Sequence, residues 1–236
     1  MVRASDGSSI WNEIFAPLQL ISDVNNFFDN GMRFVLCGVN YVDSDEWYIL
    51  NTVAPPNTPP TFPPPISEWK ALQAYVDNLN SAIPKGYIDI FIVGGFHQNL
   101  SGIAARPQSV SSRGSVACQY RAETVAHELG HYFGLAHTFS GGPFAGTPPQ
   151  FAQYVDDPVI INQESFTGWE TGDFIPDTPA DPGSSYCNES SACGLISNCV
   201  VADPHGKTYA PDPTLLMSYY SGCYYRFSSN QSGFVA

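Results

Sequence analysis

The apolar residues of this chain fall into short periodic runs, and most of these runs lie before about residue 140. Residues 10–29 repeat apolar side chains every three or four positions, which predicts a helix in which Pro17 can introduce a kink or a restart. Residues 67–82 repeat in the same way after Ser67, a suitable N-cap, and predict a second helix.

Strand patterns lie among these helical ones. Residues 32–42 alternate and are rich in β-formers, so they predict a strand, and the continuous apolar run at 87–93 predicts a buried strand. Residues 101–107 and 114–120 predict two shorter strands. The stretch that begins at Arg121 consists of good helix-forming residues and leads into a histidine-rich segment.

The texture of the chain changes after Phe139. Residues 140–215 are rich in Gly, Pro, Asp, Ser and Thr and show little periodicity, so we expect irregular structure pinned by disulfides or ions. The sequence therefore predicts one α+β domain, with a front lobe over about 1–137 and a loop-rich back lobe over about 138–236. The front lobe would hold a twisted mixed β-sheet and two or three long helices. Ser228 and Gln231 have the spacing of a capping box and predict a final helix.

Composition narrows the classes of partner. Hydrophobic residues make up 43% of the 236 residues, which is enough for a packed core. The formal net charge of -13 argues against nucleic acid or an anionic membrane surface as a partner and is compatible with a basic peptide. No apolar run is long enough to predict a membrane span.

The six cysteines point to an oxidising compartment. Their number is even and no pair has the spacing of a structural zinc site, so we expect disulfides and a secreted, extracellular protein. We expect Cys37 to pair with Cys118 and the other four to pair among themselves, although six cysteines allow fifteen connectivities. The first nine residues contain no apolar leader, so we expect a secreted form to have lost it.

Three of the five histidines lie in the stretch AHELGHYFGLAHTF, at 126–139. On a helix, His127 and His131 project from one face and can share an ion, while Glu128 lies beside them and can reach a water at that ion. Gly134 can take a positive φ and end the helix, which allows His137 to turn back towards the same ion.

This donor set predicts a catalytic zinc site. Three neutral imidazoles leave a position open for water, whose pKa zinc lowers towards about 7, and Glu128 would take the proton and deliver it to a leaving amine. The pattern H-E-x-x-H-x-x-G-x-x-H fixes five positions, so at roughly one in twenty per position its chance occurrence here is below about one in a thousand.

The stretch HELGHYFGLAH resembles the zinc-binding motif of the metzincin metallopeptidases. Metzincins also have a methionine-containing turn beneath the zinc, and LLMSYY at 215–220 is similar to it. The resemblance implies that Met217 is the turn methionine and that Tyr219 lies near the metal and stabilises the tetrahedral intermediate.

Further stretches resemble the pappalysin/cytophagalysin family, with an ulilysin-like catalytic domain. They are HELGHYFGLAHTF, GDFIPDTPADPG at 172–183 and MSYYSGCYYRFSSNQ at 217–231, although Leu215 stands where the family often has asparagine. The resemblance implies structural calcium, with Asp177 and Thr178 as candidate ligands, although a plain turn explains these two residues equally well. Relatives carry a pro-segment that blocks the zinc, and its absence here is typical of a mature catalytic unit.

Three functions remain open. The first is a secreted zinc endopeptidase that acts on a protein or peptide substrate. The second is a non-catalytic zinc-containing binding module on the same scaffold, which would not need Glu128. The third is a zinc enzyme that acts on a non-peptide amide or on a chain end.

Overall fold

The computed structural model describes the chain over the following ranges: 1–8, 16–28, 31–50, 72, 74–75, 87–96, 100–105, 114–139, 155, 159–161, 164–166, 173–189, 196–203, 205–220 and 226–235. The chain divides into two compact units. Unit 1 comprises Met1–Asn25 with Phe34–Tyr132, and unit 2 comprises Asn26–Arg33 with Phe133–Ala236. Helices and small mixed sheets together confirm the predicted α+β class.

A three-stranded mixed sheet forms the centre of unit 1. Strand β7 (Ser115–Cys118) lies between β4 (Asp89–Ile92), which is parallel to it, and β6 (Gly102–Ala105), which is antiparallel. These strands confirm the patterns at 87–93, 101–107 and 114–120. Because β7 contributes four fully buried residues in succession, it reads as a continuous apolar and small-residue run rather than as an alternating one.

Unit 1 also contains two short strand pairs and a short helix that connects them. Strand β1 (Val2–Arg3) runs parallel to β2 (Val42–Asp43), and β3 (Ile49–Leu50) runs parallel to β5 (Gly95–Phe96). Helix α2 (Asp45–Tyr48) connects the two pairs along the chain, and its N-cap Ser44 accepts a hydrogen bond from the amide of Trp47.

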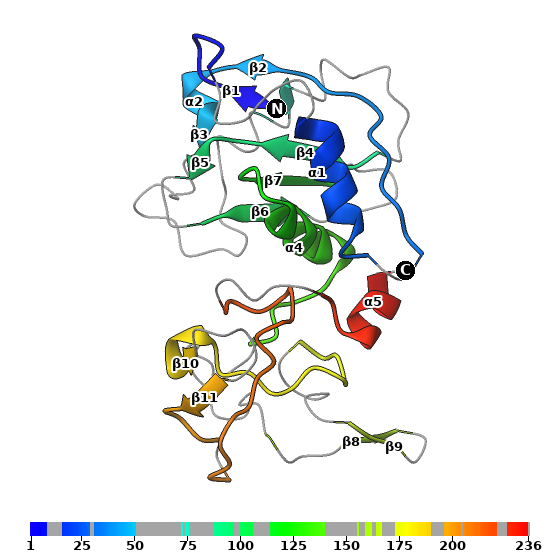
Figure 1. Ribbon diagram of the computed structural model, residues 1–236, viewed down its shortest axis with the longest axis vertical. Coiled ribbons are helices and arrows are strands. Elements are labelled where there is room, and N and C mark those ends of the chain that lie inside the picture. Colours follow the sequence, from blue (N-terminus) through cyan, green and yellow to red (C-terminus); the bar gives the residue numbers. More distant parts are fainter. Residues whose placement is uncertain are drawn as a thin grey trace. The chain divides into compact units, whose positions relative to one another are not determined.

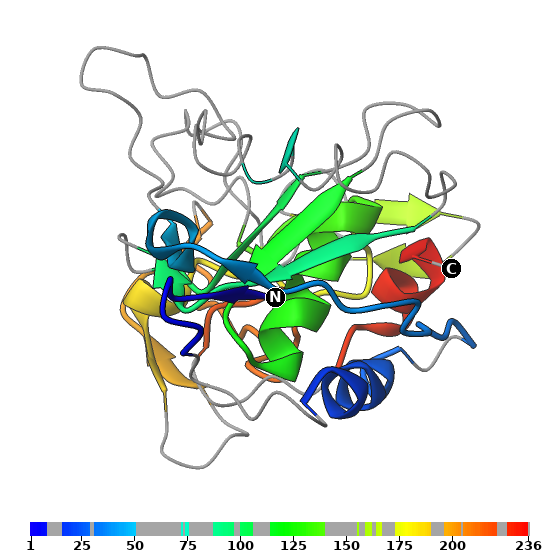
Figure 2. The ribbon, with the colours of Figure 1, turned by 90° about the horizontal axis from the view of Figure 1, so that it is seen from above.

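Unit 1 also contains two longer helices, of which the second extends by its last residue into unit 2. Helix α1 (Ala16–Asn25) lies inside the predicted range 10–29, of which 10–15 and 29 fall outside the described residues. In α1, Leu18 is 63% exposed, although the helical repeat of apolar residues over 10–29 predicts that Leu18 lies on the buried face. Helix α4 (Ala122–Phe133) runs next to β6 (Figure 1), and the strands of the sheet cross it in the view from above (Figure 2).

The core of unit 1 is a cluster of buried apolar side chains, joined by the half-buried Trp47, Tyr48, Phe96 and Ile103. Its members are Val2, Leu50, Leu72, Phe91, Val93 and Ala117. Leu72 is helical and fully buried, as expected of the predicted helix 67–82, most of which lies outside the described residues. Through Ile103 the cluster extends to β6, the strand whose Gly102 lies against Glu128 of α4.

The prediction of a strand over 32–42 is wrong except at its last residue. Residues 31–37 alternate between more and less exposed positions as a strand would, but residues 31–41 pair with no other strand in the described part of the chain. At Phe34, the backbone amide and carbonyl instead bond to the side chain of Asn25, at 2.7 and 3.0 Å. The local pattern is typical of a strand, but at Phe34 the side chain of Asn25 makes the hydrogen bonds that a neighbouring strand would otherwise make.

Unit 2 contains short, separate elements, as the irregular texture of the back lobe predicted. Antiparallel pairs form between β8 (Val159–Ile161) and β9 (Glu164–Phe166), and between β10 (Cys187–Glu189) and β11 (Ile196–Cys199). A 3-10 turn, η2 (Ser184–Tyr186), precedes β10. No helix in the described part of the chain is long and apolar enough to cross a membrane.

The last helix confirms the capping-box prediction. Helix α5 (Ser229–Val235) begins directly after Ser228. The hydroxyl of Ser228 accepts the amide of Gln231, and the amide of Ser228 donates to Oε1 of Gln231, both at 3.0 Å.

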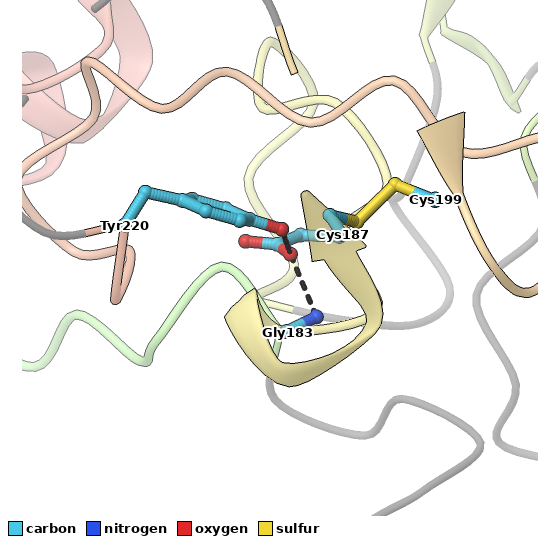
Figure 3. The surroundings of a disulfide bond; sticks show 5 residues. Gly183, Cys187, Cys199 and Tyr220 are labelled. Carbon is cyan, nitrogen blue, oxygen red and sulfur yellow. Dashed lines mark hydrogen bonds between the residues drawn. A yellow bond between two sulfur atoms is a disulfide. The ribbon is translucent and has the colours of Figure 1, made fainter. Parts of the chain in front are cut away.

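One disulfide lies in the described residues, and it agrees with the expectation that the four later cysteines pair among themselves. Cys187 and Cys199 are bonded to each other (Figure 3). They pack with Ala180, Tyr209 and Tyr220. The predicted pairing of Cys37 with Cys118 is wrong, because Cys118 is buried in β7 while Cys37 is exposed, and both are free thiols. Cys193 and Cys223 lie outside the described residues.

Candidate metal centre

Helix α4 positions the first two histidines. It buries Val125, Ala126 and Leu129, so its opposite side carries the half-buried His127 and His131. The two imidazole rings are one helical turn apart, with centroids 4.8 Å from each other and planes at 87°.

The segment after α4 brings in the third histidine. The helix ends at Phe133, and Gly134 follows with a φ of 110°, a backbone conformation that side-chain-bearing residues rarely adopt. One nitrogen each from His127, His131 and His137 lies within 4.8 Å of the other two. Among the described residues, this is the one group of three or more His, Cys, Asp or Glu side chains close enough to hold an ion together.

Three imidazole nitrogens are a donor set that suits zinc in catalytic sites, because they leave at least one position open. All three histidines are half-buried, so the group is neither sealed in the core nor fully solvated. The residues therefore fit the predicted ion, and His127, His131 and His137 are those that would hold it.

Glu128 lies beside this group with its carboxylate buried. Its side chain is 5% exposed, and burial raises its pKa to about 8. A cation bound at the neighbouring imidazoles would lower that pKa again, because an opposite charge favours the ionised form. A buried carboxyl that titrates near neutral pH can both take and return a proton.

Gly102 on β6 makes room for this carboxylate. A Cβ atom added to Gly102 would lie 2.6 Å from Cγ and 2.7 Å from Oε1 of Glu128, closer than such atoms approach in proteins. Gly102 pairs with Cys118 in the sheet, so its position is fixed by the strand register. Gly102 could not be identified from the sequence, because nothing in the local pattern reveals a contact with a helix residue 26 positions away.

The predicted methionine turn lies against the third histidine's segment in unit 2. The amide of Thr138 donates a hydrogen bond of 3.1 Å to the carbonyl of Met217, whose side chain is fully buried. The ring of Tyr219 is 48% exposed and lies 4.5 Å from the ring of His137, centroid to centroid. Phe139, which the local sequence pattern does not reveal as a site residue, stacks on His137 with ring centroids 4.8 Å and planes 9° apart.

Asp177 and Thr178, the candidate calcium ligands, have protein partners. The carboxylate of Asp177 accepts the hydroxyl of Ser228 at 2.6 Å and the amide of Asn230 at 2.9 Å, so it anchors the start of α5. The hydroxyl of Thr178 donates to Oδ1 of Asp173 at 2.7 Å. These bonds explain both residues without an ion, and calcium binding stays a prediction.

Comparison with protein families agrees with this geometry. Residues 73–138 match the Reprolysin-like metallo-peptidase family M12B, and this range includes Glu128 and all three histidines. The match covers less than a third of the chain and does not extend to Met217 or Tyr219. Among curated proteins, none matches the chain at a significant level. The chain thus contains a metallopeptidase-like segment that carries a three-histidine group able to hold a metal ion.

Proposed function

We propose that this protein is a zinc-dependent endopeptidase whose single catalytic domain spans 1–236. The observation that carries the proposal is the convergence of His127, His131 and His137 inside the metallopeptidase match, with Glu128 buried next to the first of them. Zinc binding alone would not require a carboxylate there, so Glu128 favours catalysis over the alternative of a zinc-containing binding module.

Within this proposal, each residue has a separate task. A bound zinc ion supplies Lewis acidity, which lowers the pKa of water and polarises a carbonyl oxygen. Glu128 accepts the proton of the attacking water at a carboxylate oxygen and later delivers it to the amine that leaves when the peptide C–N bond breaks. The buried position of Glu128 keeps bulk water from competing for that proton.

Tyr219 would stabilise the oxyanion that forms when water adds to the peptide carbonyl. Two observations support this role: its exposed fraction of 48% leaves the side chain accessible to substrate, and its ring contacts that of His137. Met217 would support the site through its backbone carbonyl, which accepts the amide of Thr138, the residue next to the third histidine.

The finer assignments of subfamily and calcium rest on the sequence. The pappalysin/cytophagalysin subfamily is supported by residues 172–183 and 217–231, and structural calcium at Asp177 and Thr178 belongs to the same proposal. Secretion is supported by the Cys187–Cys199 disulfide, because such bonds persist in oxidising compartments.

The test is hydrolysis of casein and of a mixed peptide library by the purified protein. We expect internal cleavage that a chelator abolishes and zinc restores, and loss of cleavage by at least about a thousandfold in Glu128→Gln. Glu123→Gln is the matched control, since Glu123 lies on the same helix and pairs with Arg121 at the surface. Zinc binding without cleavage would favour the zinc-containing binding module. Cleavage only at chain ends would favour a zinc enzyme that acts on chain ends.

A further inference from the structure

Asp181 is a buried carboxylate that joins two segments of unit 2. It is 1% exposed, and both of its oxygens accept hydrogen bonds. The hydroxyl of Thr138 donates to Oδ2 at 2.6 Å. The hydroxyl of Tyr220 and the amide of Gly183 donate to Oδ1 at 2.7 and 2.8 Å.

The two hydroxyl donors are the direct chain neighbours of two candidate site residues. Thr138 follows His137, and Tyr220 follows Tyr219. The rings of His137 and Tyr219 are in contact, with centroids 4.5 Å apart. A closed circuit therefore runs from His137 through Thr138, Asp181 and Tyr220 to Tyr219, and back through the ring contact.

Tyr220 gives this circuit a fixed anchor. Its ring is fully buried and packs in the cluster that contains the Cys187–Cys199 disulfide. Figure 3 shows the ring extending towards Cys187, with its hydroxyl group at the carboxylate that also accepts the amide of Gly183. One oxygen of Asp181 accepts the hydroxyl of Thr138 and the other accepts that of Tyr220, so a single buried carboxyl group joins Thr138 to this anchor.

We propose that Asp181 is a positioning residue that fixes His137 for metal binding and Tyr219 for catalysis. In this role Asp181 contacts neither metal nor substrate. It acts on His137 through Thr138 and on Tyr219 through Tyr220. The inference rests on the proposed function, since it assumes that His137 is a metal ligand. Groups that orient metal ligands from the next layer outward contribute to both metal affinity and activity.

Zinc affinity, measured by competition with a chromophoric chelator, tests the first half. Asp181→Asn should weaken zinc binding roughly ten- to a hundredfold, the usual effect of losing such a partner. Thr138→Val removes one hydroxyl at nearly constant shape and should weaken it about tenfold, whereas Thr138→Ser keeps the hydroxyl and should restore affinity. Equal losses in Thr138→Val and Thr138→Ser would overturn the hydrogen-bond assignment.

Peptide hydrolysis tests the second half. Tyr220→Phe removes the other hydroxyl while keeping the ring against the disulfide, and should lower kcat about tenfold with little change in KM. Tyr209→Phe, in the same apolar cluster, is the matched control and should have no such effect. On a Tyr219→Phe background the Tyr220→Phe loss should disappear, because both changes act through one side chain. Full additivity would overturn the link to Tyr219.

These readouts separate the proposal from the function on which it rests. If the protein binds zinc but cleaves nothing, and Asp181→Asn still weakens zinc binding, the positioning role stands and the endopeptidase assignment fails. If Asp181→Asn does not fold, the single-hydroxyl variants decide. Wild-type zinc affinity in Thr138→Val together with wild-type kcat in Tyr220→Phe would refute the proposal.

Discussion

The α carbon of Gly102 lies directly against the side chain of Glu128, with no room for a Cβ atom between them. Gly102 belongs to an edge strand of the three-stranded sheet and Glu128 to helix α4, so the contact sets the distance between strand and helix at the candidate proton-transfer group. A glycine is required here by a close approach and not by its backbone angles.

Replacing Gly102 by alanine should therefore displace the carboxylate of Glu128. We expect kcat for peptide hydrolysis to fall roughly a hundredfold, the cost of a displacement of about 1 Å at a catalytic group, with zinc affinity unchanged. Gly95→Ala is the control, because a Cβ atom at that strand glycine would lie 3.8 Å from its nearest neighbour, the side chain of Gln119. Equal activity in the two variants would show that the contact does not position Glu128.

Gly134 should resist substitution because of its backbone angle. At a φ of 110°, alanine is strained by about 1–3 kcal/mol, and its Cβ would also lie 3.2 Å from Cε1 of Phe234. Gly134→Ala should lower the free energy of unfolding by that amount and weaken zinc binding, because the turn that returns His137 is distorted. Gly233→Ala in α5, where a Cβ meets nothing within 4 Å, should instead stabilise the protein by about 0.5–1 kcal/mol. Urea unfolding of both variants makes the comparison.

Asp173 should make stability depend on pH. Burial raises its pKa to about 6, whereas the carboxyl of an unfolded chain titrates near 3.9. Between these values the folded state holds a proton that the unfolded state has released, so this contribution to stability is complete below about pH 4 and declines as pH rises through 6. The decline amounts to roughly 2–3 kcal/mol. Asp173→Asn should remove it, and the difference between the two urea-unfolding profiles at pH 4.5 and 7.5 measures it. Parallel profiles would show that Asp173 has an ordinary pKa in the folded protein.

The cap of α5 should contribute measurable stability. Ser228 accepts the amide of Gln231 and donates to Asp177, so Ser228→Ala removes both bonds and should cost about 1 kcal/mol. Ser229→Ala changes the exposed first residue of the same helix and should leave the free energy of unfolding nearly unchanged. Thermal unfolding of the two variants gives the test, and equal stabilities would exclude a capping role for Ser228.

Local patterns predicted those parts of the structure that depend on local chemistry. Strands β4, β6 and β7, helix α4 and the cap at Ser228 follow from periodicity and from hydrogen bonds between residues close in sequence. The approach of His127, His131 and His137 agrees with the spacing argument because the segment that joins them is only eleven residues long.

Contacts between distant parts of the chain could not be predicted in this way. Asp181 bonds to Thr138 across 43 positions and to Tyr220 across 39, and no periodicity encodes either pairing. The pattern at 32–42 carried a strand signal, but a strand also needs a partner, and the side chain of Asn25 satisfied the backbone at Phe34 instead. The free thiols of Cys37 and Cys118 show the same limit, because an even cysteine count does not place two residues together.

Zinc titration of the wild type and of His137→Ala tests the central claim most directly, with His205→Ala as the control for a histidine outside the group. We predict one tightly bound zinc per chain in the wild type and in His205→Ala, and an affinity at least about a hundredfold weaker in His137→Ala, because two imidazoles cannot replace three. Wild-type zinc affinity in His137→Ala would contradict the account.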